Sequence, residues 1–157
     1  MSDAPGGAGP FIVRAAPSDA AALAGLAAAA LPEPWSEEGF AEELTLPQAR
    51  IWLARSAAGR LVGYLAAQRI LDELLVLSVA VAEAQRRRGT GRALLERAVA
   101  SEPGVRVVHL EVRSNDAGAQ AFYDRLGFRR VGIRGGFYPG GVDALLLSRR
   151  VAGPEAG

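Results

Sequence analysis

The residues from 85 to 98, QRRRGTGRALLERA, have the types and spacing that suit phosphate binding. Three arginines run into Gly89 and Gly91, and apolar residues follow at the spacing of one helix face. A helix that begins at such a turn presents unpaired N–H groups, and its dipole favours an anion there. The glycines let the backbone approach a ligand closely. The turn therefore predicts a site for a pyrophosphate or another phosphate-bearing ligand.

The rest of the chain narrows the ligands that this turn could hold. A dinucleotide fingerprint needs a third glycine after GTG, where Leu94 stands, and a P-loop needs a lysine, which the chain lacks. A nucleic-acid surface is expected to carry a larger basic excess than a net charge of +1. A solvated arginine cluster at the start of an ordinary helix stays open, because short glycine-rich matches are common by chance.

Glu111 is the best candidate for a base. It lies in the strand-like stretch VRVVHLEVR, where alternation puts it with His109 and Arg113, opposite Leu110 and Val112. A carboxylate on a half-buried strand is costly unless it is paired or wet, so the pattern alone favours a salt bridge to Arg113 or a rim position. His109 is a rival base, although a lone histidine on a strand is more often structural.

Tyr123 is the candidate proton donor. It lies on a predicted helix beside an apolar face formed by Ala119, Phe122 and Leu126. On the residues alone it could equally be an aromatic at the core edge with its hydroxyl in water. A strand end and the helix that follows it can converge on one cleft, so Glu111 and Tyr123 can meet there.

Composition excludes several kinds of chemistry. Without cysteine the chain has no thiolate nucleophile, disulfide or cysteine zinc site, and without lysine it has no Schiff base. His109 is the only histidine, so no paired-histidine motif can form and we expect no metal. The first residues lack the pattern of a signal sequence, and the apolar run 74–82 is too short to span a bilayer. We therefore expect a cytoplasmic protein without a membrane partner.

The elements that must position these residues read as a mixture of strands and helices. Strands are expected at 11–16, 49–56, 60–70, 71–81, 105–113, 128–134 and 142–151. Helices are expected at 17–31, between Ser36 and Pro47, from about Gly89, and at 115–127. A glycine-rich turn, GGFYPGG, would join the last two strands. This order favours an α/β fold, with a mixed sheet covered by helices on both faces.

Local signals set the boundaries of these elements. Ser18 or Asp19 would cap the first helix and Ser36 the second, and Gly127 would end the fourth. The 157 residues, half of them apolar, suit one globular domain, expected over 10–151. Flexible tails rich in glycine, proline and alanine are expected at 1–9 and 152–157.

Four motifs in order resemble one known family. RRRGTGRAL resembles the Q/R-x-x-G-x-G/A signature of the GCN5-related N-acetyltransferases (GNAT), and HLEVRSNDAGAQAFYDRLGF resembles the second half of that fold. With PWSEEGF and FYPGG, the pattern is most similar to the ribosomal-protein-alanine N-acetyltransferase (RimI-like) group. The resemblance runs from Phe11 to Arg150. It implies a single-domain acyl-CoA N-acyltransferase fold with a mixed, mostly antiparallel central sheet flanked by about four helices.

The resemblance also implies which residues bind the co-substrate and which carry out the reaction. Acetyl-CoA is the expected co-substrate. Its pantetheine arm would bond the main chain of Val79, Ala80 and Val81, and its pyrophosphate would lie against Arg87, Arg88, Gly89, Thr90, Gly91 and Arg92. Glu111 matches the family's base, which acts through ordered water. Tyr123 matches the tyrosine that gives a proton to the coenzyme thiolate.

The chain departs from the subgroup at three places. The asparagine usually found five residues after the glutamate is Asp116 here, with Asn115 one residue earlier, so either could contact the coenzyme. Where the subgroup usually has a pair of tyrosines, this chain has Phe137 and Tyr138. Where it often has an acidic residue before the final DA, this chain has Val142. The aromatic residues expected to line the acceptor cleft, although ordinary packing explains them equally well, are Trp35, Phe40, Phe137 and Tyr138.

The expected function is acetyl transfer from acetyl-CoA to a peptide or protein N-terminal α-amine, with the N-terminal alanine of a small-subunit ribosomal protein as the acceptor that the resemblance implies. A direct ternary-complex mechanism is expected, since no cysteine can relay the acetyl group. The alternatives are an acetyltransferase for a small-molecule amine and a coenzyme-binding module without catalysis. A nucleic-acid binder using Arg86, Arg87 and Arg88 is the third, although no direct nucleic-acid binding is expected.

Overall fold

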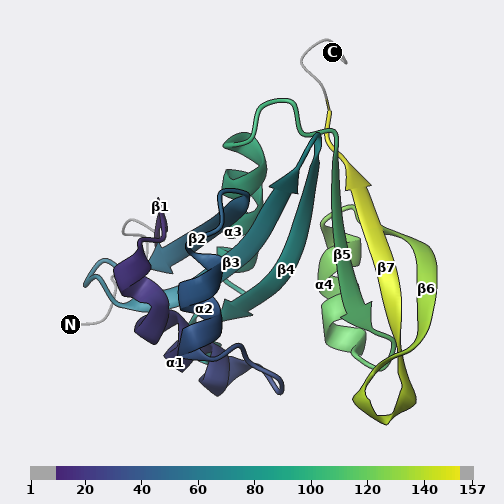
Figure 1. Ribbon diagram of the computed structural model, residues 1–157, viewed down its shortest axis with the longest axis horizontal. Coiled ribbons are helices and arrows are strands. Elements are labelled where there is room, and N and C mark those ends of the chain that lie inside the picture. The colour runs from purple at the N-terminus through teal and green to yellow at the C-terminus, as the bar shows by residue number, and fades with distance from the viewer. Residues whose placement is uncertain (1–9, 153–157) are drawn as a thin grey trace.

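The structure is a computed structural model that describes residues 10–152. Its strands form one sheet in the spatial order β1-β2-β3-β4-β5-β7-β6 (Figure 1). They are β1 (Phe11–Arg14), β2 (Ala49–Arg55), β3 (Leu61–Ile70), β4 (Glu73–Val81), β5 (Val107–Arg113), β6 (Arg129–Tyr138) and β7 (Val142–Arg150). β4 and β5 pair in parallel, and the other neighbouring pairs are antiparallel. The expected mixed, mostly antiparallel sheet is confirmed.

Helices cover both faces of this sheet, as expected. They are α1 (Ala20–Ala30), α2 (Glu37–Glu43), α3 (Thr90–Ala100) and α4 (Ala117–Arg125). In Figure 1, α1 and α2 lie in front of β2, β3 and β4, while α3 and α4 lie behind the sheet. The predicted tails, 1–9 and 152–157, fall outside the described residues except for residue 152.

Each face of the sheet has its own apolar core. Leu23, Phe40 and Tyr64 belong to the core under α1 and α2. The core under α3 and α4 contains Leu94 and Leu95 together with alternate residues of β5. In β5 this alternation buries Val108, Leu110 and Val112 and turns His109, Glu111 and Arg113 to the opposite face. The expected placement of Glu111 on that face is confirmed.

The predicted helix caps are confirmed at α2 but not at α1. Ser36 Oγ accepts a hydrogen bond from the Gly39 N–H at 3.0 Å, as an N-cap residue does. Asp19 stands directly before α1, yet its carboxylate accepts from the Ala16 N–H at 2.6 Å and pairs with Arg55 at 2.8 Å. The prediction that Ser18 or Asp19 caps α1 is therefore wrong, because the Asp19 side chain closes the preceding turn and bonds to β2 instead.

The last two strands meet differently from the prediction. β6 continues to Tyr138, so GGFY belongs to the strand and only Pro139–Gly141 forms the short 3-10 turn before β7. Between the pairs Arg134–Ala144 and Tyr138–Val142 the register shifts, and three residues of β6 oppose Asp143 alone. The Asp143 carboxylate accepts a hydrogen bond from the Gly136 N–H at 2.9 Å. This side-chain bond replaces a strand pairing, and periodicity alone does not predict it.

β4 and β5 diverge, and the sheet opens between them. Their pairing covers only Glu73–Leu75 against Val107–His109. In the register with β3, Leu77 is an extra residue between Val76 and Ser78, and such a bulge bends its strand. The two strands meet at the top of Figure 1 and separate toward the bottom. The main chain of β4 beyond Val76 is therefore free of β5.

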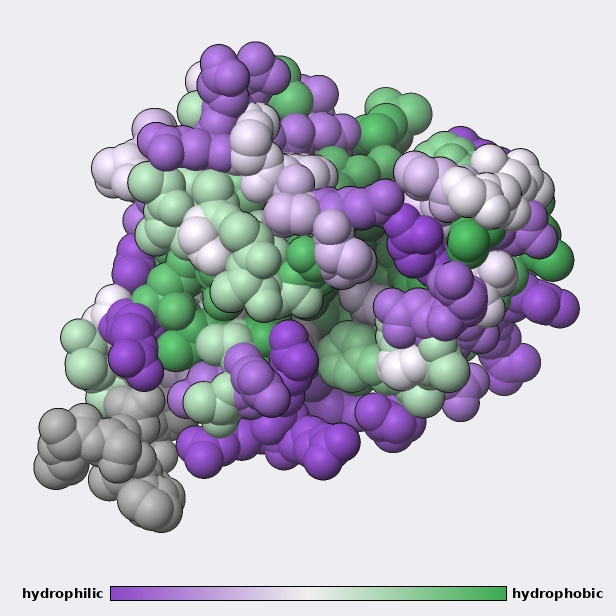
Figure 2. Space-filling view, turned by 90° about the horizontal axis from the view of Figure 1, so that it is seen from below, coloured by the Kyte–Doolittle hydropathy of each residue, from purple (hydrophilic) through white to green (hydrophobic). Residues whose placement is uncertain are grey.

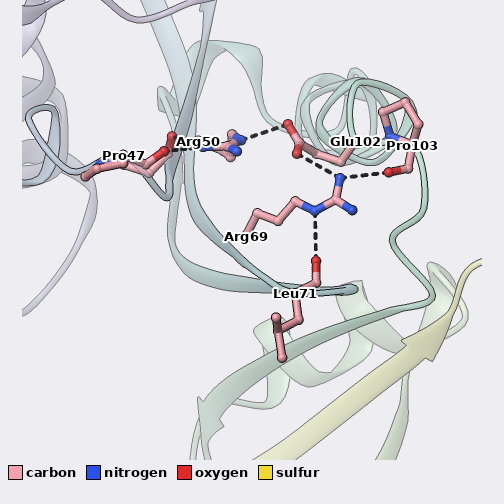
Figure 3. A network of polar contacts seen from close by, with 7 residues as sticks. Pro47, Arg50, Arg69, Leu71, Glu102 and Pro103 are labelled. Atoms are coloured by element: carbon pink, nitrogen blue, oxygen red, sulfur yellow. Dashed lines mark hydrogen bonds and ion pairs between the residues drawn. The ribbon is translucent and has the colours of Figure 1, made fainter.

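A buried carboxylate anchors the far end of α3. Glu102, only 7% exposed, accepts from Arg50 at 2.9 Å and from Arg69 at 3.4 Å (Figure 3). Both arginines also donate to main-chain oxygens, Arg50 to that of Pro47 and Arg69 to that of Leu71. Charged groups this buried are stable only with such complete pairing. The network fixes the C-terminal end of α3 against β2 and β3, and this sets where its N-terminus lies.

Candidate active site

The arginine-glycine turn forms the N-terminus of α3, as predicted. Gly89 is the residue before the helix and has φ of 80°. Arg87 has φ of 65°, which is rare for a residue with a side chain. Two left-handed residues so close together bend the chain sharply and leave the first N–H groups of α3 without helical partners. Strained backbone of this kind is often found where a ligand is held.

Gly91 is required for a close contact between α3 and α4. A Cβ atom at this position would lie 2.9 Å from Phe122 Cζ, closer than such atoms approach in proteins. Thr90 beside it is buried, and its Oγ1 has no hydrogen-bond partner within residues 10–152. The turn therefore lies against α4 with no room for a larger residue at position 91.

A large hollow of about 750 Å³ connects this turn with the opened edge of β4. We call it the large hollow. It is lined by residues of β4, the turn, α4 and the end of α1: Ala30, Leu31, Val79, Ala80, Val81, Gln85, Arg86, Arg87, Gly89, Thr90, Gly91, Arg92, Gly118, Ala119, Ala121, Phe122, Tyr123, Arg125 and Leu126. All the residues predicted for coenzyme binding on β4, and all but Arg88 in the turn, are in this lining. Sequence reasoning missed Gln85, as well as Arg86, which donates to the Val81 main-chain oxygen at 3.1 Å.

A small hollow of about 230 Å³ lies next to the first, between β4 and β5. Its lining includes Glu111 and Tyr123 together with Trp35 and Tyr138. The two hollows share Leu31, Val79, Ala119 and Tyr123, so they are continuous. Figure 2 views the molecule from below, where hydrophobic residues lie deep between two lobes and hydrophilic residues occupy the margin. A long ligand in the large hollow could thus present one end to the small one.

Tyr123 stands where the two hollows meet. Its ring packs edge-on against Phe122 at 4.9 Å and Phe128 at 5.4 Å between centroids. Gly127, with φ of 89°, ends α4 as predicted, and the Phe128 N–H donates to the Tyr123 main-chain oxygen at 3.0 Å. Burial raises the pKa of Tyr123 well above its usual value, and the negative charge of Asp116 raises it further. The phenol therefore keeps its proton at physiological pH.

Glu111, on β5, lines the small hollow, and its side chain is 27% exposed. Its carboxylate pairs with Arg134 of β6 at 3.0 Å. The salt bridge between Glu111 and Arg113 that the sequence pattern favours does not form, so this prediction is wrong. Arg113 instead pairs with Glu33 of the loop between α1 and α2, and its guanidinium lies 4.4 Å from the centre of the Tyr138 ring. The candidate base on β5 and the candidate proton donor on α4 thus line one small hollow.

Two of the four aromatic residues predicted for the acceptor cleft line the small hollow, and the other two do not. Trp35 and Tyr138 line the small hollow. Phe40 has no exposed surface and packs between Trp35 and Tyr64, so it supports the wall from behind. Phe137 is 46% exposed and outside both linings, with its ring under the Arg134 guanidinium at 4.8 Å.

The structure also separates the two candidates for the extra coenzyme contact. Asp116 lines the small hollow, and its carboxylate caps α4 by accepting from the Ala119 N–H at 3.0 Å. Asn115 is exposed and lies in neither lining. His109, the rival base, lies outside both hollows, bonded to Ser148 at 2.7 Å and to Glu73 at 3.2 Å. It stabilises the closed end of the β4–β5 pair.

The fold and the paired hollows define the class of protein. The parallel strands β4 and β5 separate beside a helix that begins at a glycine-rich turn, and a carboxylate and a phenol face the hollow between them. This arrangement is the one expected for an acyl-CoA N-acyltransferase fold. The acetyltransferase (GNAT) family matches residues 20–128, and the chain belongs to this family. The expected family, fold and enzyme class, an N-acetyltransferase, are confirmed.

Particular relatives narrow the comparison. The chain is 35% identical to ribosomal protein bS18-alanine N-acetyltransferase of Escherichia coli (strain K12) over 120 residues, or 73% of this chain and 80% of that protein. It is 37% identical to N-alpha-acetyltransferase RimI of Mycobacterium tuberculosis over 128 residues, or 78% and 80% of the two chains. The crystal structure of the ribosomal-protein-S18-alanine N-acetyltransferase from Escherichia coli superposes with a TM-score of 0.83 and 31% identity, covering 92% of this chain and 97% of that one.

Two absences hold for residues 10–152. No helix in this part of the chain is long and apolar enough to cross a membrane. The same residues contain no group of three or more acidic, histidine or cysteine side chains arranged to bind a metal ion.

Proposed function

We propose that the protein transfers acetyl from acetyl-CoA to the N-terminal α-amine of a protein or peptide. The N-terminal alanine of a small-subunit ribosomal protein is the first acceptor to test. One observation carries this proposal: Glu111 and Tyr123 face the small hollow where it joins the large hollow at Val79. Two relatives support the choice of acceptor by their names. One, 35% identical, is named for an alanine of ribosomal protein bS18, and the other, 37% identical, is named an N-alpha-acetyltransferase.

The large hollow suits the coenzyme. The left-handed Arg87 and Gly89 turn the first N–H groups of α3 toward it, and Arg92 adds positive charge for a pyrophosphate. The free main chain of β4 from Val79 to Val81 can bond the amides of the pantetheine arm, as an added strand does. This arrangement directs the thioester toward Val79, where the small hollow begins.

The chemistry follows from the two side chains. A free α-amine has a pKa of about 8, so at neutral pH it arrives mostly as an ammonium. Its proton passes to Glu111, directly or through a water, and the neutral nitrogen attacks the thioester carbonyl carbon. As the C–S bond breaks, the thiolate takes a proton from Tyr123, and the second proton leaves the acetylated nitrogen and restores the Tyr123 phenol. Burial raises the pKa of Tyr123, and a thiolate that leaves into the same apolar surroundings is made more basic by the same effect, which favours the transfer.

A small-molecule amine is the alternative acceptor within the same chemistry. The small hollow measures about 230 Å³, and its walls come from the α1–α2 loop, β5 and Tyr138. An extended peptide can enter such a hollow with its first residue and leave the remaining residues outside. A compact amine would occupy the same space without extending beyond it.

The experiment is a mass-spectrometric assay with acetyl-CoA and peptides that begin with Ala, Ser, Met or Gly and contain one lysine. The proposal expects acetyl on the α-amine and none on the lysine. A matched peptide with a blocked N-terminus serves as control, and a polyamine panel tests the alternative. Acetylation of the lysine or of polyamines alone would refute the proposal. Binding of coenzyme without transfer to any amine would indicate a non-catalytic module.

A further inference from the structure

Two arginines beside the small hollow share one arrangement. Each guanidinium lies against an aromatic ring from the end of β6 and is paired with a glutamate. Arg134 lies 4.8 Å from the centre of the Phe137 ring and 3.0 Å from Glu111. Stacking and pairing together fix a planar guanidinium more firmly than either contact alone.

The neighbouring arginine leaves Arg134 as the partner of the base. Arg113 lines the same hollow as Glu111, but its guanidinium stacks on Tyr138 and pairs with Glu33 instead of Glu111. Burial and the charge of Glu111 raise the pKa of Tyr138, so its hydroxyl is neutral at physiological pH. Within residues 10–152, Arg134 is the one charged side chain that forms an ion pair with Glu111.

Arg134 and the acceptor approach Glu111 from different sides. The Arg134 side chain is 55% exposed and belongs to neither hollow lining, so its guanidinium reaches the carboxylate from the outer rim. The acceptor nitrogen must reach the same carboxylate from inside the small hollow. An ion pair this exposed is weak, so a second cation can exchange with it at little cost.

We propose that Arg134 is a positioning residue that holds Glu111 until the acceptor arrives and then yields it to the acceptor ammonium. This inference rests on the proposed function, since it requires a cationic amine as acceptor. While the small hollow is free of acceptor, the guanidinium pairs with the carboxylate and keeps it in place. When the ammonium enters, Arg134 gives up Glu111 and remains on the Phe137 ring.

Competition between the two cations benefits the reaction. A cation close to an amine disfavours the amine's charged form, so Arg134 opposes a lasting ion pair between Glu111 and the ammonium. The ammonium then gives up its proton more readily, to Glu111 or through water to the solvent, and the nitrogen is left neutral for attack. Without Arg134 the ammonium would bind the carboxylate more tightly and react more slowly, because binding energy would be gained by the wrong protonation state.

Kinetics of three variants test this role against a merely structural one. Arg134→Met is expected to lower kcat about tenfold or more and also to lower KM for the peptide. Arg134→Lys, which keeps the charge, should fall between Arg134→Met and the wild type. Arg130→Met is the matched control, because Arg130 lies on the same strand but lines a depression between α4 and β6 that neither Glu111 nor Tyr123 lines. Values within twofold of this control, or a raised peptide KM with weakened coenzyme binding, would overturn the proposal.

A spectroscopic test does not depend on turnover. The arginine side-chain N–H signal of Arg134, identified by its loss in Arg134→Met, is followed in the complex with coenzyme A. Titration with an Ala-starting peptide should shift this signal, and the N-acetylated form of the same peptide should leave it unchanged. An unmoved signal with a peptide that is turned over overturns the exchange and leaves the proposed function intact. A shifted signal with a peptide that is never acetylated supports the exchange and refutes the proposed function.

Discussion

Gly91 offers a sharp test of how α3 is placed against α4. A methyl group added at this position would lie 2.9 Å from Phe122 Cζ, and ordinary contacts between such atoms begin at about 3.4 Å. Phe122 is itself held by Tyr123, whose ring centroid is 4.9 Å away, so it has little freedom to retreat. Gly91→Ala must therefore push the turn away from α4 or displace Phe122 toward the candidate proton donor.

The magnitude follows from two opposing effects. Overpacking of this kind typically costs about 1–3 kcal/mol. Replacing a helical glycine by alanine returns about 0.5–1 kcal/mol. The net change expected for Gly91→Ala is a loss of about 1 kcal/mol, which in a chain of this size lowers Tm by about 2–4 °C. Gly25 in α1 is the control, because a Cβ there meets no atom within 4 Å, and Gly25→Ala should gain about 0.5–1 kcal/mol.

Urea unfolding of both variants measures these changes, and calorimetry with coenzyme A measures binding. Gly91→Ala should also weaken coenzyme binding, while Gly25→Ala should not. In a double-mutant cycle, Phe122→Leu should relieve the clash and recover about 1 kcal/mol of coupling. If Gly91→Ala stabilises the protein as much as Gly25→Ala and binds coenzyme A normally, the close approach of α3 to α4 is not what position 91 requires.

Four further predictions concern single side chains. Glu111→Gln should slow turnover at neutral pH and recover as pH rises, because more acceptor is then neutral; equal rates for variant and wild type at every pH would remove Glu111 as base. Tyr123→Phe should lower kcat by about 100-fold with little change in coenzyme affinity, since a general acid typically contributes that much; an unchanged kcat would remove Tyr123 as donor. Because burial raises the pKa of Tyr123 in the folded protein, the stability that its phenol contributes is complete below about pH 10 and lost above it, so Tyr123→Phe should lose less stability than wild type between pH 10 and 12, as seen in alkaline unfolding curves. Glu102→Ala should lower the free energy of unfolding by about 3 kcal/mol, measured in urea, because it leaves two partly buried arginines unpaired, and a loss under 1 kcal/mol would contradict the anchoring role.

Elements with strong local signals could be predicted from the sequence. The apolar period after Gly89 and the cap at Ser36 are short-range features, and both are found as expected. The opening of the sheet could not be read from SVAV, because the bulge at Leu77 depends on the register with β3. The length of β6 was also missed, since Asp143 substitutes a side-chain bond for a strand pairing.

Within the site, proximity was less predictable than residue type. The base candidate was placed on the correct strand face, but its partner, Arg134, comes from β6 and is 23 residues away in sequence. Phe40 was expected in the cleft because aromatic residues suit clefts, yet its position on the inner face of α2 buries it completely. Gln85 and Arg86 join the large hollow because a 3-10 turn at Glu83–Gln85 brings the chain back across the end of β4.

The central claim is that the turn before α3 holds the diphosphate of acetyl-CoA. Calorimetric titration with acetyl-CoA and with S-acetylpantetheine, which has the same thioester arm but no diphosphate or nucleotide, tests it directly. Charge-assisted hydrogen bonds contribute about 1.5–3 kcal/mol each, so losing two of them predicts at least about 100-fold weaker binding of the shorter compound. Equal affinity for the two compounds, or no heat with either, would contradict the assignment of this turn.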